Sequence, residues 1–298
     1  MDKQNKIKQV IIDNKLKDHY NFEDIINIYG IEIEQSHAID MSKVTFIEPY
    51  SMLSLLLMGK KFLRNRGEKL QLINIPINIH QYLARMDFLK TGIFNMPAKL
   101  DEKLFLKRSN FSSRVIEITE IPNKERESVK VITSVIELFR KRATHILKYW
   151  LSDYIVGFFV TVISELCQNI FEHSLDSGYL SMQTYSLDGD NILRLVISDS
   201  GIGMKKSFEM KKEIQYESDA NLIEKALTTP ISSKRKFGYG LCQVNSIVEK
   251  LNGTIYIRSG NASVTALYHK KKKGGSYMFL KNDLAFFEGV QISITLTG

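Results

Sequence analysis

The sequence contains 298 residues, of which 44% are hydrophobic and 25% are charged. This composition is typical of a globular protein and excludes disordered, collagen-like and disulfide-scaffold chains. At roughly 150 residues per domain the length predicts two domains, with enough chain to bury a core without metals or disulfides. The formal net charge of +8, from 41 basic and 33 acidic residues, permits an anionic partner without requiring one, because both signs are mixed along most of the chain.

Three features of the sequence bear on its cellular location. The two cysteines, Cys167 and Cys242, form neither a Cys-x-x-Cys pair nor a zinc spacing, which fits a reducing compartment. The N-terminal Met-Asp-Lys-Gln-Asn-Lys leads into no apolar signal core. The longest apolar stretch, residues 149–163, contains Asp153 and is too short and too polar for a membrane span, so it predicts a core helix. We therefore expect a cytoplasmic protein without a membrane partner.

The first hundred residues alternate between helix and strand patterns with short connections. Such alternation predicts a parallel α/β layer. The expected elements are a helix over 20–30, a strand over 31–34, a strand over 37–47 broken by a polar turn, a helix over 51–66 that ends at Gly67, a strand over 70–75 and a helix over 77–88.

Residues 106–113 are polar, rich in serine and free of periodicity, so they predict a linker between domains at 1–108 and 109–298. The residues after the linker predict a second α/β domain. Its expected elements are a strand over 114–121, helices over 128–174 with a break near 151–153, a hairpin of strands over 179–186 and 192–198, a helix over 240–251, and strands over 254–258, 264–268, 276–280 and 290–296. The Lys-rich stretch 201–237 predicts a mobile loop with a helical piece over 221–227.

One motif lies on the long helix of this second domain. Glu165, Asn169 and His173 are spaced i, i+4 and i+8, so they share a helix face. An amide oxygen there can hold Mg²⁺ while the carboxylate orients or deprotonates an attacking oxygen. The alternative interpretation is the polar stripe of an ordinary amphipathic helix.

A second motif follows a strand, where Asp199 is succeeded by Gly201 and Gly203. The two glycines let the backbone turn tightly and approach a ligand. A buried carboxylate at this position could accept a hydrogen bond from an exocyclic amine such as that of adenine. An ordinary strand-to-loop turn is the alternative.

A third motif, Lys236-Phe-Gly238-Tyr-Gly240-Leu241, leads directly into a helix. Glycines before a helix N-terminus expose backbone N–H groups that suit phosphate oxygens. The basic run 234–236 adds positive charge beside them. A plain helix start is the alternative interpretation.

The order and spacing of the three motifs resemble the GHKL ATPase superfamily, which includes gyrase, heat-shock chaperones, histidine kinases and MutL. The resemblance covers about residue 114 to the end, and it implies a Bergerat fold in which a mixed sheet carries helices on one face and ATP lies between helix and lid. The site residues it implies are Asp199 for the adenine amine, Gly201 and Gly203 for the pocket edge and lid hinge, Asn169 for Mg²⁺, Lys236, Gly238, Gly240 and Leu241 at the phosphates, and Glu165 as the group that activates water or a substrate hydroxyl.

The sequence departs from the superfamily pattern in two places. The last glycine box reads Gly289-Val290 instead of Gly-Thr, which leaves one hydroxyl contact on the adenine side in doubt. His145 lacks the His-Glu context of a phosphoacceptor helix, so a sensor histidine kinase is not expected. The string Glu-Leu-x-x-Asn-x-x-Glu-His-Ser is closer to the anti-sigma-factor serine kinases.

The first domain resembles the STAS fold of anti-sigma-factor antagonists over residues 39–73. That family usually carries Asp-Ser-Ser-Gly where this sequence has Glu48-Pro49-Tyr50-Ser51. The phosphorylated serine of the family falls on Tyr50, and Ser51 occupies the glycine slot. Regulation by serine phosphorylation is therefore not expected at position 50, which is a tyrosine here. Phosphorylation of Ser51 stays an open alternative.

The resulting hypothesis is a cytoplasmic ATP–Mg²⁺-binding switch that hydrolyses ATP slowly or transfers its phosphoryl group to a serine or threonine of a partner. A regulatory protein would bind through the STAS-like domain or the lid, and homodimerisation stays open. One alternative is an ATP-gated nucleic-acid clamp that uses the basic runs 234–236 and 270–273, and it is weakly supported. Another is an inert nucleotide-binding scaffold.

Overall fold

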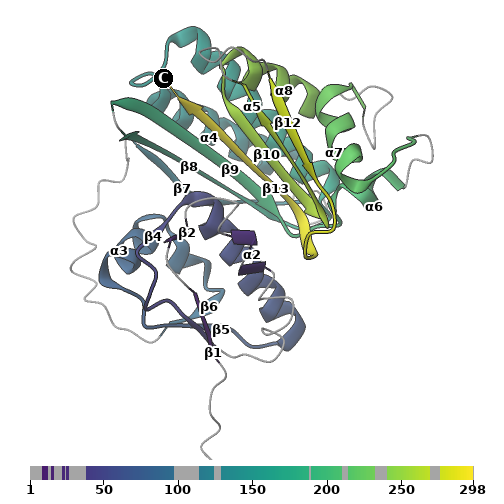
Figure 1. The fold of residues 1–298 in the computed structure, drawn as a ribbon. Coiled ribbons are helices and arrows are strands. Elements are labelled where there is room, and N and C mark those ends of the chain that lie inside the picture. The colour runs from purple at the N-terminus through teal and green to yellow at the C-terminus, as the bar shows by residue number, and fades with distance from the viewer. Residues whose placement is uncertain are drawn as a thin grey trace, which may run out of the picture. The chain divides into compact units, whose positions relative to one another are not determined.

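The computed structural model describes residues 9–12, 15–16, 22–23, 25–26, 38–96, 114–123, 129–187, 189–209, 214–231, 240–268 and 276–297. The chain divides into two compact units, Met1–Phe111 and Ser112–Gly298 (Figure 1). This division falls three residues beyond the expected boundary at 108/109. The expected linker over 106–113 and the expected strand over 31–34 lie outside the described residues.

The first unit contains a four-stranded parallel sheet with the order β1-β3-β5-β6. A separate parallel pair joins β2 to β4. The strands are β1 (Gln9–Ile11), β2 (Lys15–Leu16), β3 (Ala38–Asp40), β4 (Phe46–Ile47), β5 (Leu70–Ile73) and β6 (Phe94–Asn95). The helices are α2 (Pro49–Arg66), α3 (Ile77–Arg85) and the 3₁₀ helix η2 (Phe88–Thr91). The expected parallel α/β layer is confirmed, and residues 22–23 and 25–26 of the expected first helix are helical.

Helix α2 ends where the sequence predicts, but it begins two residues earlier than expected, at Pro49. Pro49 occupies the first helical position, where its missing N–H costs no hydrogen bond. Gly67 adopts a left-handed φ of 72° and donates its N–H to the Leu63 carbonyl, which closes the helix. Tyr50 and Ser51, in the first turn, are both buried, and the Tyr50 ring packs edge-on against Phe22 at 6.1 Å between ring centroids.

The second unit is a seven-stranded sheet with the order β12-β11-β10-β13-β9-β8-β7. Its strands are β7 (Val115–Ile121), β8 (Gly178–Leu187), β9 (Asp190–Asp199), β10 (Thr254–Gly260), β11 (Ala262–Leu267), β12 (Tyr277–Lys281) and β13 (Phe287–Thr297). Every neighbouring pair is antiparallel, which corrects the expectation of a mixed sheet. The reason is that β13 runs between the hairpins β8–β9 and β10–β11 and is antiparallel to a strand of each.

The described residues of this unit form five helices, which gather on one face of the sheet (Figure 1). They are α4 (Val129–Leu147), α5 (Asp153–His173), α6 (Gly203–Glu209), α7 (Asp219–Thr228) and α8 (Gly240–Lys250). On β9 the alternate residues Leu193, Leu195 and Ile197 enter the core beneath the helices, because successive side chains of a strand point to opposite faces. The result is an α/β sandwich in which a helical layer lies over the sheet.

Helix α5 is the one helix in the described part of the chain that is long and apolar enough to cross a bilayer. Val162, Leu166 and Ile170 are nevertheless buried in the core of the second unit, as the sequence predicts. Glu165 and Asn169 interrupt the apolar surface on a neighbouring face. These features identify α5 as a core helix of the second unit.

The Lys-rich stretch 201–237 is more ordered at its start than expected. The expected helical piece is confirmed as α7, but the sequence analysis missed α6. Met204, Ser207 and Phe208 of α6 are buried at i, i+3 and i+4, and the helix packs against β10 and β13. A seven-residue helix contains too few apolar positions to establish a period, so its sequence signal is weak.

Candidate functional site

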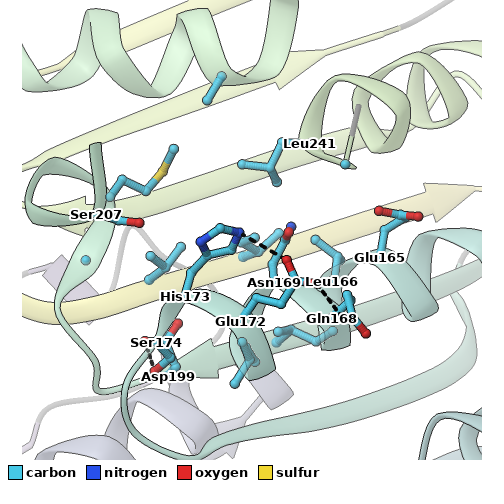
Figure 2. Close-up of a pocket in the computed structure, with 18 of the residues that line it drawn as sticks. Glu165, Leu166, Gln168, Asn169, Glu172, His173, Ser174, Asp199, Ser207 and Leu241 are labelled. Atoms are coloured by element: carbon cyan, nitrogen blue, oxygen red, sulfur yellow. Dashed lines mark hydrogen bonds and ion pairs between the residues drawn. The ribbon is translucent and has the colours of Figure 1, made fainter. Parts of the chain in front are cut away.

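A pocket of about 350 Å³ opens beside α5 in the second unit, in the size range of small-molecule sites. Its walls come from α5, the end of β9, α6, the start of α8 and β13. Figure 2 shows residues of α5 along one side of the pocket, with Leu241 of α8 and Ser207 of α6 across from them. Segments that lie far apart in the sequence therefore meet around one cavity.

All three polar residues that the sequence places on one face of α5 line this pocket. Glu165, Asn169 and His173 follow one another along the helix (Figure 2). The start of α8 lies against the first two, because a Cβ added to Gly240 would lie 3.3 Å from Glu165 Oε2 and 3.4 Å from Asn169 Oδ1. The first N–H groups of a helix lack intrahelical partners and carry a partial positive charge. This end of the pocket is suited to phosphate oxygens.

Asp199 lies at the other end of the site, at the end of β9, and only 5% of its surface is exposed. Burial raises the pKa of its carboxyl group to about 6, because desolvation disfavours the charged form. The Ser174 hydroxyl and the Gly201 N–H each donate to Oδ1 at 2.8 Å and partly oppose that rise. The backbone of Val290 provides a further hydrogen bond, while the charge of Asp176 adds to the rise in pKa. At neutral pH Asp199 is therefore a buried, ionised acceptor.

Three glycines permit the close packing around Asp199. A Cβ on Gly201 would lie 1.8 Å from the Ser174 carbonyl oxygen, and one on Gly289 would lie 1.9 Å from the Asp199 carbonyl oxygen. Gly289 and Gly203 also have φ values of 75° and 74°, which side chains rarely tolerate. Val290, which replaces the threonine of the superfamily pattern, lines the pocket with an apolar side chain.

The middle of the pocket is apolar between its two polar ends. Ile170, Ile197 and Ile292 line it, together with Met204 and Phe208 of α6. A flat aromatic ring fits such walls, and Asp199 at their edge can accept a hydrogen bond from an amine on that ring. The pocket thus combines an apolar slot, one buried acceptor and a helix N-terminus.

Sequence reasoning missed several polar residues that the fold brings to the site. The Gln168 amide donates to Glu172 Oε1 at 2.6 Å, and His173 Nε2 lies 3.9 Å from Glu172 Oε2 (Figure 2). Ser174 also faces Asp199, although twenty-five residues separate them in the sequence. No periodicity or spacing links Ser174 to Asp199, so the sequence offered no signal for their hydrogen bond.

The structure assigns no positions to two of the expected phosphate-site residues. Lys236 and Gly238 lie outside the described residues, whereas Gly240 and Leu241 both line the pocket. Among the described residues no group of three or more His, Cys, Asp or Glu side chains could hold a metal ion. Mg²⁺ commonly uses one or two protein oxygens together with phosphate oxygens and water, so Asn169 Oδ1 is a fitting donor beside bound phosphates.

Comparison with known families agrees with this geometry. Residues 156–284 match the family model described as "Histidine kinase-, DNA gyrase B-, and HSP90-like ATPase". The matched segment contains most of α5, the Asp199 turn and the start of α8, and it supports placing the second unit in the GHKL superfamily, whose domains bind ATP. A search of curated proteins found no match. The matched segment does not reach the first unit, so its STAS-like character stays a prediction, as does the anti-sigma-factor kinase branch.

Proposed function

We propose that the protein is an ATP–Mg²⁺-binding regulatory switch whose second unit binds the nucleotide and whose first unit binds a regulatory protein. The observation that carries the proposal is the arrangement of the pocket, with buried Asp199 at one end and Glu165, Asn169 and the start of α8 at the other. ATP has matching chemistry, since an amine-bearing ring and an anionic triphosphate occupy its two ends.

The Asp199 carboxylate supports the binding of adenine in preference to guanine. Adenine carries an amine where guanine carries a carbonyl, so guanine would bring an oxygen against the Asp199 carboxylate. Loss of one hydrogen bond to a charged group costs about 1.5–3 kcal/mol, which is roughly tenfold or more in affinity. Ile197 and Ile292 would contact the ring faces or edges from the sheet side.

Glu165 and Asn169 would have different roles at the phosphate end of the pocket. Asn169 Oδ1 would hold Mg²⁺, which supplies charge neutralisation at the phosphates when bound. Glu165 would take the proton from an attacking oxygen as that oxygen bonds to the γ-phosphorus and the bond to the ADP leaving group breaks. With water as the attacking group the reaction is hydrolysis, and with a serine or threonine hydroxyl of a partner it is phosphoryl transfer.

The switch would act through α6, which begins at the Gly203 hinge. Met204, Ser207 and Phe208 of α6 line the pocket, so a bound nucleotide would contact this helix directly. Such contacts would favour the conformation in which α6 closes the pocket and would change the surface offered to a partner. The cytoplasm, inferred from the sequence, is the proposed location. The nucleic-acid alternative depends on residues 234–236 and 270–273, which lie outside the described residues, and stays a prediction.

Calorimetric titration with ATP, ADP and GTP, each with and without Mg²⁺, tests the binding proposal. We expect ATP and ADP to bind and GTP to bind at least about tenfold more weakly. Equal affinity for ATP and GTP would contradict the role of Asp199. Hydrogen exchange of α6 tests the switch, because bound ATP should slow exchange in Met204–Phe208, and an unchanged rate would contradict gating through this helix.

Turnover of ATP labelled in the γ-phosphate separates the two reactions. Label released as phosphate indicates hydrolysis, whereas label retained on a co-purifying protein indicates phosphoryl transfer. Glu165→Gln should slow either reaction by about 10²–10⁴-fold while ATP still binds. If wild-type protein binds ATP yet turns over none with any partner, the protein is a binding switch without catalysis.

A further inference from the structure

One residue of the turn that follows α5, Ser174, is hydrogen-bonded to the Asp199 carboxylate. Ser174 ends the helix, with its N–H bonded to the Ile170 carbonyl at 3.1 Å, and only 4% of its surface is exposed. Its hydroxyl donates to Asp199 Oδ1 at 2.8 Å (Figure 2). Helix α5, which carries Glu165 and Asn169, is thereby joined to the opposite end of the pocket.

The backbone of Ser174 is bound to the same turn. Its carbonyl accepts the Ile202 N–H at 3.1 Å and occupies the space that a Cβ of residue 201 would need. The Asp176 N–H approaches the Ser174 hydroxyl oxygen at 3.3 Å from the other side. Because an ionised Asp199 can only accept hydrogen bonds, Ser174 donates its single proton to that carboxylate while its oxygen accepts from the Asp176 N–H.

We propose that Ser174 is a positioning residue for nucleotide binding, whose hydroxyl holds the Asp199 carboxylate in the orientation that accepts the amine of the base. The proposal rests on the proposed function, in which Asp199 binds that amine. Ser174 itself acts through Asp199 and has no assigned contact with the nucleotide.

The number of acceptor sites on the carboxylate supports this role. A carboxylate offers about four acceptor sites. Ser174, Gly201 and the backbone of Val290 supply three donors, which leaves one site for a donor in the pocket. Three fixed donors prevent the carboxylate from rotating, so its remaining lone pair keeps one direction.

The hydrogen bond from Ser174 should have a measurable effect on the pKa of Asp199, because it opposes the effects of burial and of a neighbouring charge. Asp176 is the charged neighbour that faces Asp199, and it disfavours the ionised form, as does burial. Ser174 and Gly201 favour that form, and only Ser174 does so through a side chain. Removal of the hydroxyl should therefore raise the pKa of Asp199 above its value of about 6.

The first experiment follows the Asp199 carboxyl carbon by ¹³C NMR between pH 4 and 9 in nucleotide-free protein. Ser174→Ala should raise its titration midpoint by about one pH unit, the amount expected for a hydrogen bond to a charged group. Ser174→Cys, which replaces the hydroxyl with a somewhat larger group that is a weaker donor, should also raise it, and Ser174→Thr should leave it near the wild-type value. Ser200→Ala is the matched control, because the buried Ser200 hydroxyl donates to Asp176 at 2.7 Å instead.

The second experiment measures the dissociation constant of ATP for Ser174→Ala and wild type at each pH. The ratio of the two constants cancels the protonation of the nucleotide itself. Loss of the fixed orientation should weaken binding by the variant by a similar factor at every pH. A midpoint that moves from about 6 to about 7 should add a further loss of roughly fivefold at pH 6 and of less than about 1.2-fold at pH 8. A structural role without a hydrogen bond to the carboxylate would give only the loss that does not depend on pH.

The outcomes separate the two proposals. An unshifted Asp199 midpoint in both Ser174→Ala and Ser174→Cys overturns the role of Ser174, as does an equal shift in Ser200→Ala. An affinity ratio that does not vary with pH also overturns it. If ATP does not bind wild-type protein at all, the proposed function fails, and the NMR titration still reports whether Ser174 holds the carboxylate.

Discussion

Replacement of Asp199 by asparagine should have opposite effects on stability and on nucleotide binding. The folded-state pKa of about 6 lies about two units above the ordinary aspartate value of 3.8. Because the folded value is the higher one, the contribution of this group to stability is fully present below pH 3.8 and is lost as the pH rises through about 6. Two units correspond to about 3 kcal/mol of unfolding free energy at most.

Asp199→Asn removes this titration, so urea unfolding of nucleotide-free protein provides the test. The stability of the variant relative to wild type should improve by about 2–3 kcal/mol between pH 4 and pH 7. The difference in unfolding free energy between variant and wild type is compared at two pH values, so effects of the substitution that do not depend on pH cancel. One such effect is repulsion between the asparagine NH₂ group and the Val290 N–H. A relative stability that is the same at both pH values would refute the argument that burial raises the Asp199 pKa.

Nucleotide binding by the same variant should weaken by roughly tenfold or more at pH 7, since the charged acceptor is lost. For wild type the affinity should fall as the pH drops through about 6, where Asp199 takes up a proton. The affinity of the variant relative to wild type should therefore recover toward low pH. Calorimetry at pH 5.5 and 8 measures this, and a relative affinity that does not depend on pH would contradict the assignment.

Three further substitutions test the rest of the pocket. Glu165→Ala should leave ATP affinity within about twofold and lower kcat by about 10²–10⁴-fold, as single-turnover measurements would show, and an unchanged rate would make Glu165 a surface carboxylate only. Asn169→Ala should weaken ATP binding in Mg²⁺ but not in EDTA, and an equal loss in both would contradict its role as a metal ligand. Gly289→Ala should cost more than about 2 kcal/mol of unfolding free energy, because its Cβ would lie 1.9 Å from the Asp199 carbonyl oxygen. Gly189→Ala, at a φ of 89° with open space around it, is the matched control and should cost less.

The sequence by itself determined the local elements of the protein. Helix α5 begins at Asp153, after the predicted break, and α2 ends at Gly67, because helix boundaries depend on residues close by in the chain. The hairpin β8–β9 forms around residues 187–190 as predicted, with Leu187 paired to Asp190. The face shared by Glu165, Asn169 and His173 was also predictable, since it follows from helical spacing alone.

Only the tertiary structure decided how those elements meet. The order of the sheet places β13 beside β9, so that Gly289 and Val290 approach Asp199, and no local pattern encodes a contact across about ninety residues. The approach of Gly240 to Glu165 and the hydrogen bond from Ser174 to Asp199 likewise depend on packing between separate segments. The raised pKa of Asp199 has the same origin, because desolvation depends on how many atoms surround the carboxyl group and not on which residues precede it in the chain.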